Sequence, residues 1–265
     1  MTRYAQARRP ERDEAGCEET VMSREKRLAR AFVDLADTLS SQFDPLDLFE
    51  RLSGHCVALL AVDAVAVVVV DARGRLRTVV ASAADIGRLD RFQVEQHEGP
   101  AQDCHRTGEP VAEADLRAGG RWPGYTARAL TAGYASVHVM PMRLNGLVIG
   151  VVSLMNRNRE EVPETDLAVA RGLCDVAAFT LVHWPAERRR EHDLLTSVQA
   201  AVSAKATVEL AKGLLSEHEG ISFTEAYHLL HRYAQQERRP LTSVCRELAE
   251  SRLGVAGLLR EAGPL

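Results

Sequence analysis

Patterns typical of β-strands occur only in the middle of this chain, and every later segment has a helical pattern. Residues 64–70 form a β-branched run, and residues 136–144 and 147–155 flank the dipeptide Asn145-Gly146. Asn-Gly is a strong hairpin signal, because a type I′ turn needs positive φ at both central positions. Strands joined by such short turns pair antiparallel. The sequence therefore predicts an antiparallel sheet, followed by a second domain that is all-helical.

Helical patterns precede and follow the strands of this sheet. Apolar residues recur at three- and four-residue spacing in residues 24–39 and 45–60. A short helix is expected over residues 101–107, between a proline and a glycine, and a longer one over residues 164–183. This order of elements predicts an α+β fold in which an antiparallel sheet has flanking helices.

Three helices are predicted after residue 186. The first covers residues 187–218 and ends at Gly220. Its apolar stripe consists of Leu194, Val198, Ala201, Val208, Ala211 and Leu215. Ser222 and Glu225 have the spacing of a capping box, which begins a second helix that runs to about residue 236. A third helix follows Pro240.

Composition narrows the class of protein. The net charge is −4, so any contact with nucleic acid must use a local basic patch. The five cysteines are scattered without a C-x-x-C pair, which argues against a disulfide framework or a zinc site. The longest apolar run, residues 62–70, is too short to cross a bilayer. We therefore expect a cytoplasmic protein without a membrane span, and a disordered, highly charged segment over residues 1–22.

Three short motifs in the last third of the chain carry a family resemblance. They are Val208-Glu-Leu-Ala-Lys-Gly-Leu-Leu215, Glu225-Ala-Tyr-x-x-Leu-x-x-Tyr-Ala234 and Leu241-x-x-Val244. With these spacings, residues 196–256 resemble an ANTAR domain, a module that binds RNA and promotes transcription antitermination. The chain departs from the family pattern at Ala204-Lys205, Ser216 and Cys245. The resemblance implies that the chain binds a pair of stem-loops in nascent RNA and so prevents a terminator hairpin.

A second set of motifs lies in the sheet-forming part of the chain. The set comprises Glu98-Gly-Pro-x-Gln-Asp-Cys-x-Arg-Thr-Gly-x-Pro110, Asp115-Leu116, Arg121-Trp-Pro123 and Ser136-Val-x-x-x-Pro141 through Gly150. With them, residues 23–183 resemble a GAF domain, which is often fused to ANTAR in bacterial regulators. This resemblance implies signal sensing, with a small-molecule ligand or with dimerisation alone. Residues 184–200 are expected to form a helical, coiled-coil linker, and residues 257–265 a tail.

Cations of the last helices form the predicted RNA-binding surface. Lys205 and Lys212 are seven residues apart, nearly two helical turns, so both are expected on one helix face. The remaining candidates are His231, Arg232, Arg238 and Arg239 for phosphates, and Tyr233 or Tyr227 for stacking on a base. Tyr227 is more simply interpreted as a core residue. The alternative for the whole surface is a solvated helix face, since acids and bases balance after residue 187.

Candidates for a ligand site in the GAF-like domain follow the first of its motifs. Cys104 lies on the short helix, and Arg121, Trp122 and Tyr125 are placed to close a pocket beside it. The alternatives are that Cys104 is a small apolar core residue and that the aromatic residues form a packed lid. The histidines lack partners at metal-ligand spacing, so we expect no metal site, and the sequence assigns no cofactor.

Three classes of function are compatible with these features. The first is a signal-responsive, homodimeric RNA-binding regulator without enzymatic activity. The second is a thiol-dependent reductase, since some GAF-fold proteins reduce methionine sulfoxide; its C-terminal helices would then serve only dimerisation or protein contacts. That chemistry needs a resolving thiol near Cys104, and none is evident. The third is a DNA-binding module or adaptor, but the first of the last helices is too long for a helix-turn-helix.

Overall fold

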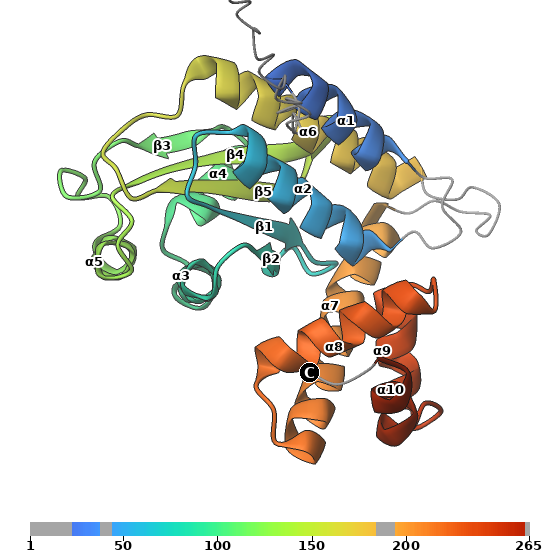
Figure 1. Ribbon diagram of the computed structural model, residues 1–265. Helices are drawn as coiled ribbons and strands as arrows, with labels where there is room; N and C mark the ends of the chain where they lie inside the picture. Colours follow the sequence, from blue (N-terminus) through green and yellow to red (C-terminus); the bar gives the residue numbers. More distant parts are fainter. Residues whose placement is uncertain (1–22, 38–43, 184–193, 263–265) are drawn as a thin grey trace, which may run out of the picture.

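The computed structural model describes residues 23–37, 44–183 and 194–262 of the chain (Figure 1). They form a sheet domain, which ends at residue 183, and a helical domain, which begins at residue 194. The predicted disorder of residues 1–22 lies outside the described residues, as do residues 184–193 of the predicted linker.

A five-stranded antiparallel sheet forms the centre of the sheet domain. Its strands are β1 (Ala64–Val70), β2 (Leu76–Ala81), β3 (Val111–Glu113), β4 (Ser136–Leu144) and β5 (Leu147–Asn156), in the order β2-β1-β5-β4-β3. Asn145 and Gly146 have φ of 49° and 80° between β4 and β5, as a type I′ turn requires. The predicted antiparallel sheet and hairpin are confirmed. The sequence analysis did not predict β3, which is too short to show a period.

Helices cover both faces of this sheet (Figure 1). One layer consists of α1 (Arg24–Ala36), α2 (Pro45–Leu59) and α6 (Glu164–His183), and the other of α3 (Ala84–Gln96), α4 (Pro100–Thr107) and α5 (Pro123–Thr131). In β1, Val65 and Val67 face the first layer, whereas Ala66 and Val68 face the second. A strand buried on both faces needs apolar residues at every position, which explains the uninterrupted β-branched run.

Two helices of the second layer, α3 and α5, were not predicted from the sequence. The inward face of α3 consists of Ile86, Leu89, Asp90 and Gln93, all buried. Because two of these four side chains are polar, the apolar period that identifies an amphipathic helix is interrupted.

Four helices form the helical domain: α7 (Leu194–Glu219), α8 (Phe223–Gln236), α9 (Leu241–Ala249) and α10 (Val255–Ala262). The predicted stripe of α7 is buried from Val198 to Leu215. The capping box of α8 is confirmed: Ser222 Oγ accepts from the Glu225 amide at 3.2 Å, and Glu225 Oε2 accepts from the Ser222 amide at 2.8 Å. Residues 257–262, which were assigned to a tail from the sequence, belong to α10. Its Leu258 is fully buried in the core.

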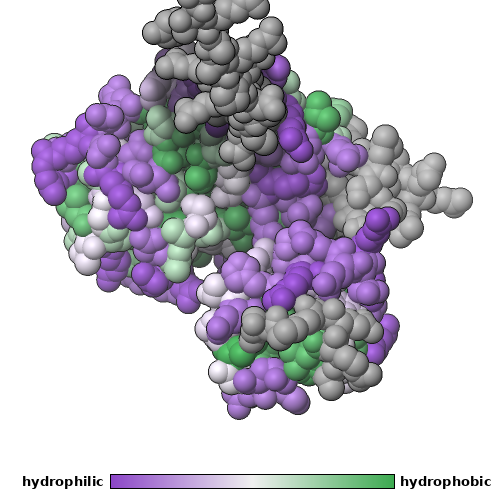
Figure 2. Space-filling view, viewed as in Figure 1, coloured by the Kyte–Doolittle hydropathy of each residue, from purple (hydrophilic) through white to green (hydrophobic). Residues whose placement is uncertain are grey.

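The two domains share one apolar cluster, which runs from beneath the sheet into the helical domain. It contains Leu48 and Leu52 of α2 as well as Val208 of α7 and Leu230 of α8. Figure 2 shows the helical domain as a separate lobe with a hollow between it and the sheet domain. The start of α2 and the helices α7 and α8 meet where the lobes join (Figure 1).

Candidate nucleic-acid interface

Lys205 and Lys212 lie on the same face of α7, as their spacing predicts. Both ammonium groups contact Glu209, from Lys205 at 2.9 Å and from Lys212 at 3.0 Å. Burial alone would raise the pKa of Glu209, but the hydrogen bonds and charges of the two lysines outweigh it and lower that pKa. The three side chains therefore form one charged cluster, with two positive charges against one negative charge.

Lys212 is the more enclosed of the two lysines. Its side chain is 16% exposed, compared with 38% for Lys205. Its Nζ lies 5.7 Å from the ring centre of Phe223 and 5.9 Å from that of Tyr227, within the range of cation–π attraction. Aromatic rings from α8 thus hold the Lys212 ammonium in a defined position.

This charged cluster faces a cleft between the two domains. Lys205, Glu209, Lys212 and Tyr227 line one side of the cleft, and residues of α2 and β2 line the other. The cleft has a volume of about 470 Å³. In this structure the candidate RNA-binding lysines therefore face the sheet domain.

A second groove joins this cleft at Lys205. It lies between α7, β2 and α3, has a volume of about 850 Å³, and is lined by Arg77, Arg88 and Arg91. Arg88 and Arg91 are exposed and lie one turn apart on α3. These arginines were not connected with Lys205 from the sequence, because more than a hundred positions separate Arg91 from Lys205.

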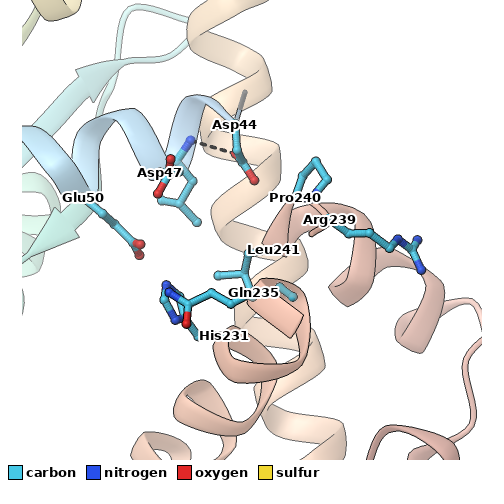
Figure 3. A pocket seen from close by; sticks show the side chains of 10 residues that line it. Asp44, Asp47, Glu50, His231, Gln235, Arg239, Pro240 and Leu241 are labelled. Carbon is cyan, nitrogen blue, oxygen red and sulfur yellow. Dashed lines mark hydrogen bonds between the residues drawn. The ribbon is translucent and has the colours of Figure 1, made fainter. Parts of the chain in front are cut away.

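Three carboxylates, from the N-cap and the first two turns of α2, face the helical domain. Asp44, Asp47 and Glu50 recur every three residues and line a small cavity of about 190 Å³ together with His231 and Gln235 of α8 (Figure 3). The Tyr227 hydroxyl donates to the Glu50 carboxylate, at 2.9 Å from each oxygen. Burial raises the pKa of Asp47 and of Glu50. Covering these carboxylates therefore has a cost, because burial disfavours their charged forms.

Asp44 caps two helices from different domains. Its Oδ1 accepts from the Leu46 amide at 2.9 Å in the first turn of α2. Its Oδ2 accepts from the Thr242 amide at 3.2 Å and from the Thr242 hydroxyl at 2.5 Å, in the first turn of α9. Proline at the N-cap of α9 has no side-chain acceptor, so Asp44 supplies the acceptor from the other domain.

The other predicted phosphate-binding residues are dispersed. His231 is half-buried, and its ring centre lies 5.9 Å from that of Tyr227, so it joins the interface. Arg232 is half-buried on α8, and Arg238 is exposed in the turn after it, with φ of 50°. Arg239 forms an ion pair with Glu247 of α9, and its guanidinium points away from the cavity (Figure 3).

The structure does not favour Tyr233 as the residue that stacks on an RNA base. Tyr233 is 5% exposed and packs in the core beside Leu229 and Leu230, so its ring faces are covered. Tyr227, for which a core position was expected, is half-buried between the two domains and donates its hydrogen bond to α2. Phe223 is 53% exposed and offers a further ring at the same site.

The candidate ligand residues of the sheet domain form a packed cluster around Asp103. Trp122 Nε1 donates to Asp103 Oδ2 at 3.0 Å, and the exposed Arg121 reaches the same oxygen at 3.2 Å and covers the Trp122 ring. Tyr125 is buried edge-on against Trp122, with its hydroxyl 3.7 Å from Met155 Sδ. This packing favours the lid interpretation of these residues.

Cys104 is also buried in this layer. Burial raises the pKa of its thiol to about 12, so the thiolate needed for nucleophilic chemistry is suppressed at neutral pH. Cys56 and Cys174 belong to the apolar cluster on the opposite face of the sheet. The sheet therefore separates Cys104 from both of these thiols.

Neither a group of metal ligands nor a membrane-spanning helix is found among the residues that the structure describes. Among residues 23–37, 44–183 and 194–262, no group of three His, Cys, Asp or Glu side chains is placed to hold a metal ion. Within the same residues, no helix is both long and apolar enough to span a bilayer.

Two family models match the chain, one in each domain. The model described as a GAF domain matches residues 44–182, and the model described as an ANTAR domain matches residues 196–248. The chain therefore belongs to the GAF domain family and carries an ANTAR domain after its GAF domain. The sheet domain is the GAF domain, and the helical domain contains the ANTAR domain. Among curated proteins, none matches this sequence.

Several solved structures are similar to the GAF part of the chain. The GAF domain of a phosphoenolpyruvate-protein phosphotransferase from Coxiella burnetii is 15% identical, with a TM-score of 0.48, and the match covers 62% of this chain and 98% of that one. The corresponding domain from Acinetobacter is 15% identical, with a TM-score of 0.47, and the match covers 69% of this chain and 97% of that one. A GAF domain/HD domain protein from Geobacter sulfurreducens is 17% identical, with a TM-score of 0.43, and the match covers 63% of this chain and 97% of that one.

Proposed function

We propose that this protein is a signal-responsive regulator that binds paired stem-loops in nascent RNA and promotes transcription antitermination. The ANTAR match over residues 196–248 supports RNA binding, and the GAF match supports signal sensing. The single observation that carries the proposal is the cluster of Lys205, Lys212 and Tyr227 on one side of the ANTAR domain. On this proposal the protein acts by binding and not by catalysis.

The chemistry of this cluster suits folded RNA. Lysine ammonium groups hold phosphates as point charges, and their binding releases counterions. Loop bases that are splayed from a stem can stack on an aromatic ring, and Tyr227 and Phe223 lie beside Lys212. Glu209 holds the two ammonium groups in place and is the group from which a phosphate must displace them.

A homodimer would present two such clusters to two stem-loops. The outer face of α7 supports this proposal, since Leu210 and Leu214 are 55% and 41% exposed there, one turn apart. Between them, Gly213 has open space around the position of a Cβ atom, so a second helix can approach closely. Light scattering of the purified chain tests the dimer, and Leu210→Glu with Leu214→Glu should convert it to a monomer.

RNA binding is tested with the full chain and a labelled RNA of two stem-loops. Affinity should fall with salt, and the double variant Lys205→Ala/Lys212→Ala should flatten the salt dependence by roughly 0.7–0.9 in slope for each phosphate that is no longer neutralised. Lys26→Ala is the matched control, because Lys26 is an exposed lysine on α1. Equal affinity for a scrambled single strand, or an equally flattened salt dependence in the Lys26 variant, contradicts the proposal.

A further inference from the structure

Acidic residues at the start of α2 lie over the ANTAR domain: Glu50 lines the cleft that holds the two lysines, and Asp44 and Asp47 line the adjoining cavity that contains His231. The other side of α2, with Leu48, Phe49 and Leu52, is buried in the core of the GAF domain. The acidic side meets Tyr227 through Glu50, and it meets α9 through Asp44. The apolar face of α2 thus packs in the GAF domain, and its carboxylate face forms hydrogen bonds with the ANTAR domain.

The acidic side of α2 that lies over the ANTAR domain is chemically similar to an RNA backbone. Asp44, Asp47 and Glu50 present a row of carboxylates at regular spacing, as a strand presents phosphates. These carboxylates occupy two kinds of position that a phosphate prefers: the N-terminus of a helix, here α9, and the surroundings of lysine and tyrosine donors.

The remaining space is too small for a folded RNA. The cleft in front of Lys205 and Lys212 has a volume of about 470 Å³, which lies in the range of small-molecule pockets. A stem-loop is far larger than such a pocket. Lys212 is 16% exposed in this cleft, so close contact of a stem-loop with its ammonium group requires α2 and the ANTAR domain to move apart.

We propose that α2 is an intramolecular competitor of RNA: its carboxylates mask the ANTAR binding face, and RNA binding requires their release. This inference rests on the proposed function and adds its regulation. A signal that shifts α2 within the GAF domain shifts the carboxylates with it, because both faces belong to one rigid helix. The cost of covering Asp47 and Glu50 offsets part of the stability of the masked state.

Two substitutions release the mask without touching the lysines. Glu50→Ala removes the acceptor of the Tyr227 hydroxyl, and Thr242→Val removes the hydroxyl that donates to Asp44. Each should raise the affinity of the full chain for a two-stem-loop RNA by about tenfold, the effect of losing one charge-assisted hydrogen bond from the masked state. Glu160→Ala is the matched control, since Glu160 is exposed on the loop before α6.

Amide hydrogen exchange checks the fold of each variant and reports on masking directly. In the Glu50 variant, the Thr242 amide should exchange faster while the amides of β1 and β5 keep their protection, since those strands lie at the centre of the sheet.

The results separate this inference from the proposed function. If both variants bind RNA with wild-type affinity, and Lys205→Ala/Lys212→Ala still flattens the salt dependence of binding, masking is wrong and RNA binding stands. If no variant binds RNA, including the unmasked ones, the proposed function fails and this inference fails with it. A rise in RNA affinity in Glu50→Ala and in Thr242→Val, but not in Glu160→Ala, supports both the masking and the proposed function.

Discussion

Asp90 should make the stability of the GAF domain depend on pH in a direction unusual for a carboxylate. It is 2% exposed on α3, and its Oδ1 accepts from Gln93 Nε2 at 2.9 Å. Its Oδ2 has no hydrogen-bond partner among the described residues. Burial raises the pKa of Asp90 from 3.8 to about 7, in spite of the hydrogen bond from Gln93.

The size of the effect follows from linkage between protonation and folding. Between pH 4 and pH 7 the unfolded chain has lost the Asp90 proton while the folded chain keeps it, so the free energy of unfolding falls as pH rises. A rise of about three pKa units corresponds to about 4 kcal/mol, at ~1.4 kcal/mol per pH unit. This contribution is fully present below pH 4 and is lost by about pH 7.

Asp90→Asn removes this titration while keeping an oxygen for Gln93. The amide leaves an unpartnered NH₂ group, which lowers the free energy of unfolding by about 1–3 kcal/mol at every pH. The test is therefore how the difference in free energy of unfolding between variant and wild type changes with pH, and not its sign. The free energy of unfolding is measured with urea at pH 5, 6 and 7. Relative to that of the wild type, the free energy of unfolding of the variant should rise by about 1 kcal/mol per pH unit.

The control is Glu95→Gln, which removes an exposed carboxylate of the same helix. Its free energy of unfolding should run parallel to that of the wild type. A constant difference between Asp90→Asn and the wild type across this range would refute the reasoning, because Asp90 would then be ionised in the folded protein.

Three further substitutions test the local structure. Gly150→Ala should destabilise the sheet by about 1–3 kcal/mol in urea unfolding, because its Cβ would lie 2.5 Å from the Val68 carbonyl oxygen; an unchanged midpoint would contradict the close approach of β5 to β1. Gly146→Ala should cost only about 1–2 kcal/mol, since the space is open and only the φ of 80° is unfavourable; a larger loss than for Gly150→Ala would reverse the expected order. Ser222→Ala should speed exchange of the Glu225 amide about fivefold, and unchanged protection would argue against the cap.

Local patterns in the sequence predicted the parts of this structure that depend on neighbouring residues. The type I′ turn at Asn145-Gly146 and the capping box at Ser222 are each determined within four residues. The shared face of Lys205 and Lys212 follows from helix geometry alone. Such features need no knowledge of the rest of the fold.

The contacts between the domains could not be predicted in this way. Asp44 and Thr242 are 198 positions apart, and Tyr227 and Glu50 are 177 apart. Each residue has an ordinary local explanation, such as a helix cap for Asp44, and nothing in the sequence links the two domains. Asp44, Asp47 and Glu50 recur every three residues in the sequence, but their role depends on the residues of the other domain that face them.

The burial of Tyr233 follows from the spacing of apolar residues in α8. Ala226, Leu229, Leu230, Tyr233 and Ala234 recur at three- and four-residue spacing and form the buried stripe of α8. Tyr233 fits this stripe, whereas Tyr227 lies outside it. Helical periodicity alone would have assigned Tyr233 to the core and Tyr227 to the surface.

Mapping the site at which RNA photo-crosslinks to the full chain tests the central claim most directly. With a bound two-stem-loop RNA, we expect crosslinked peptides to come from the part of α7 and α8 that contains Lys205, Lys212 and Tyr227, and crosslinks there to increase in Glu50→Ala. Crosslinks confined to the GAF domain, or to the Leu210–Leu214 side of α7, would contradict the account.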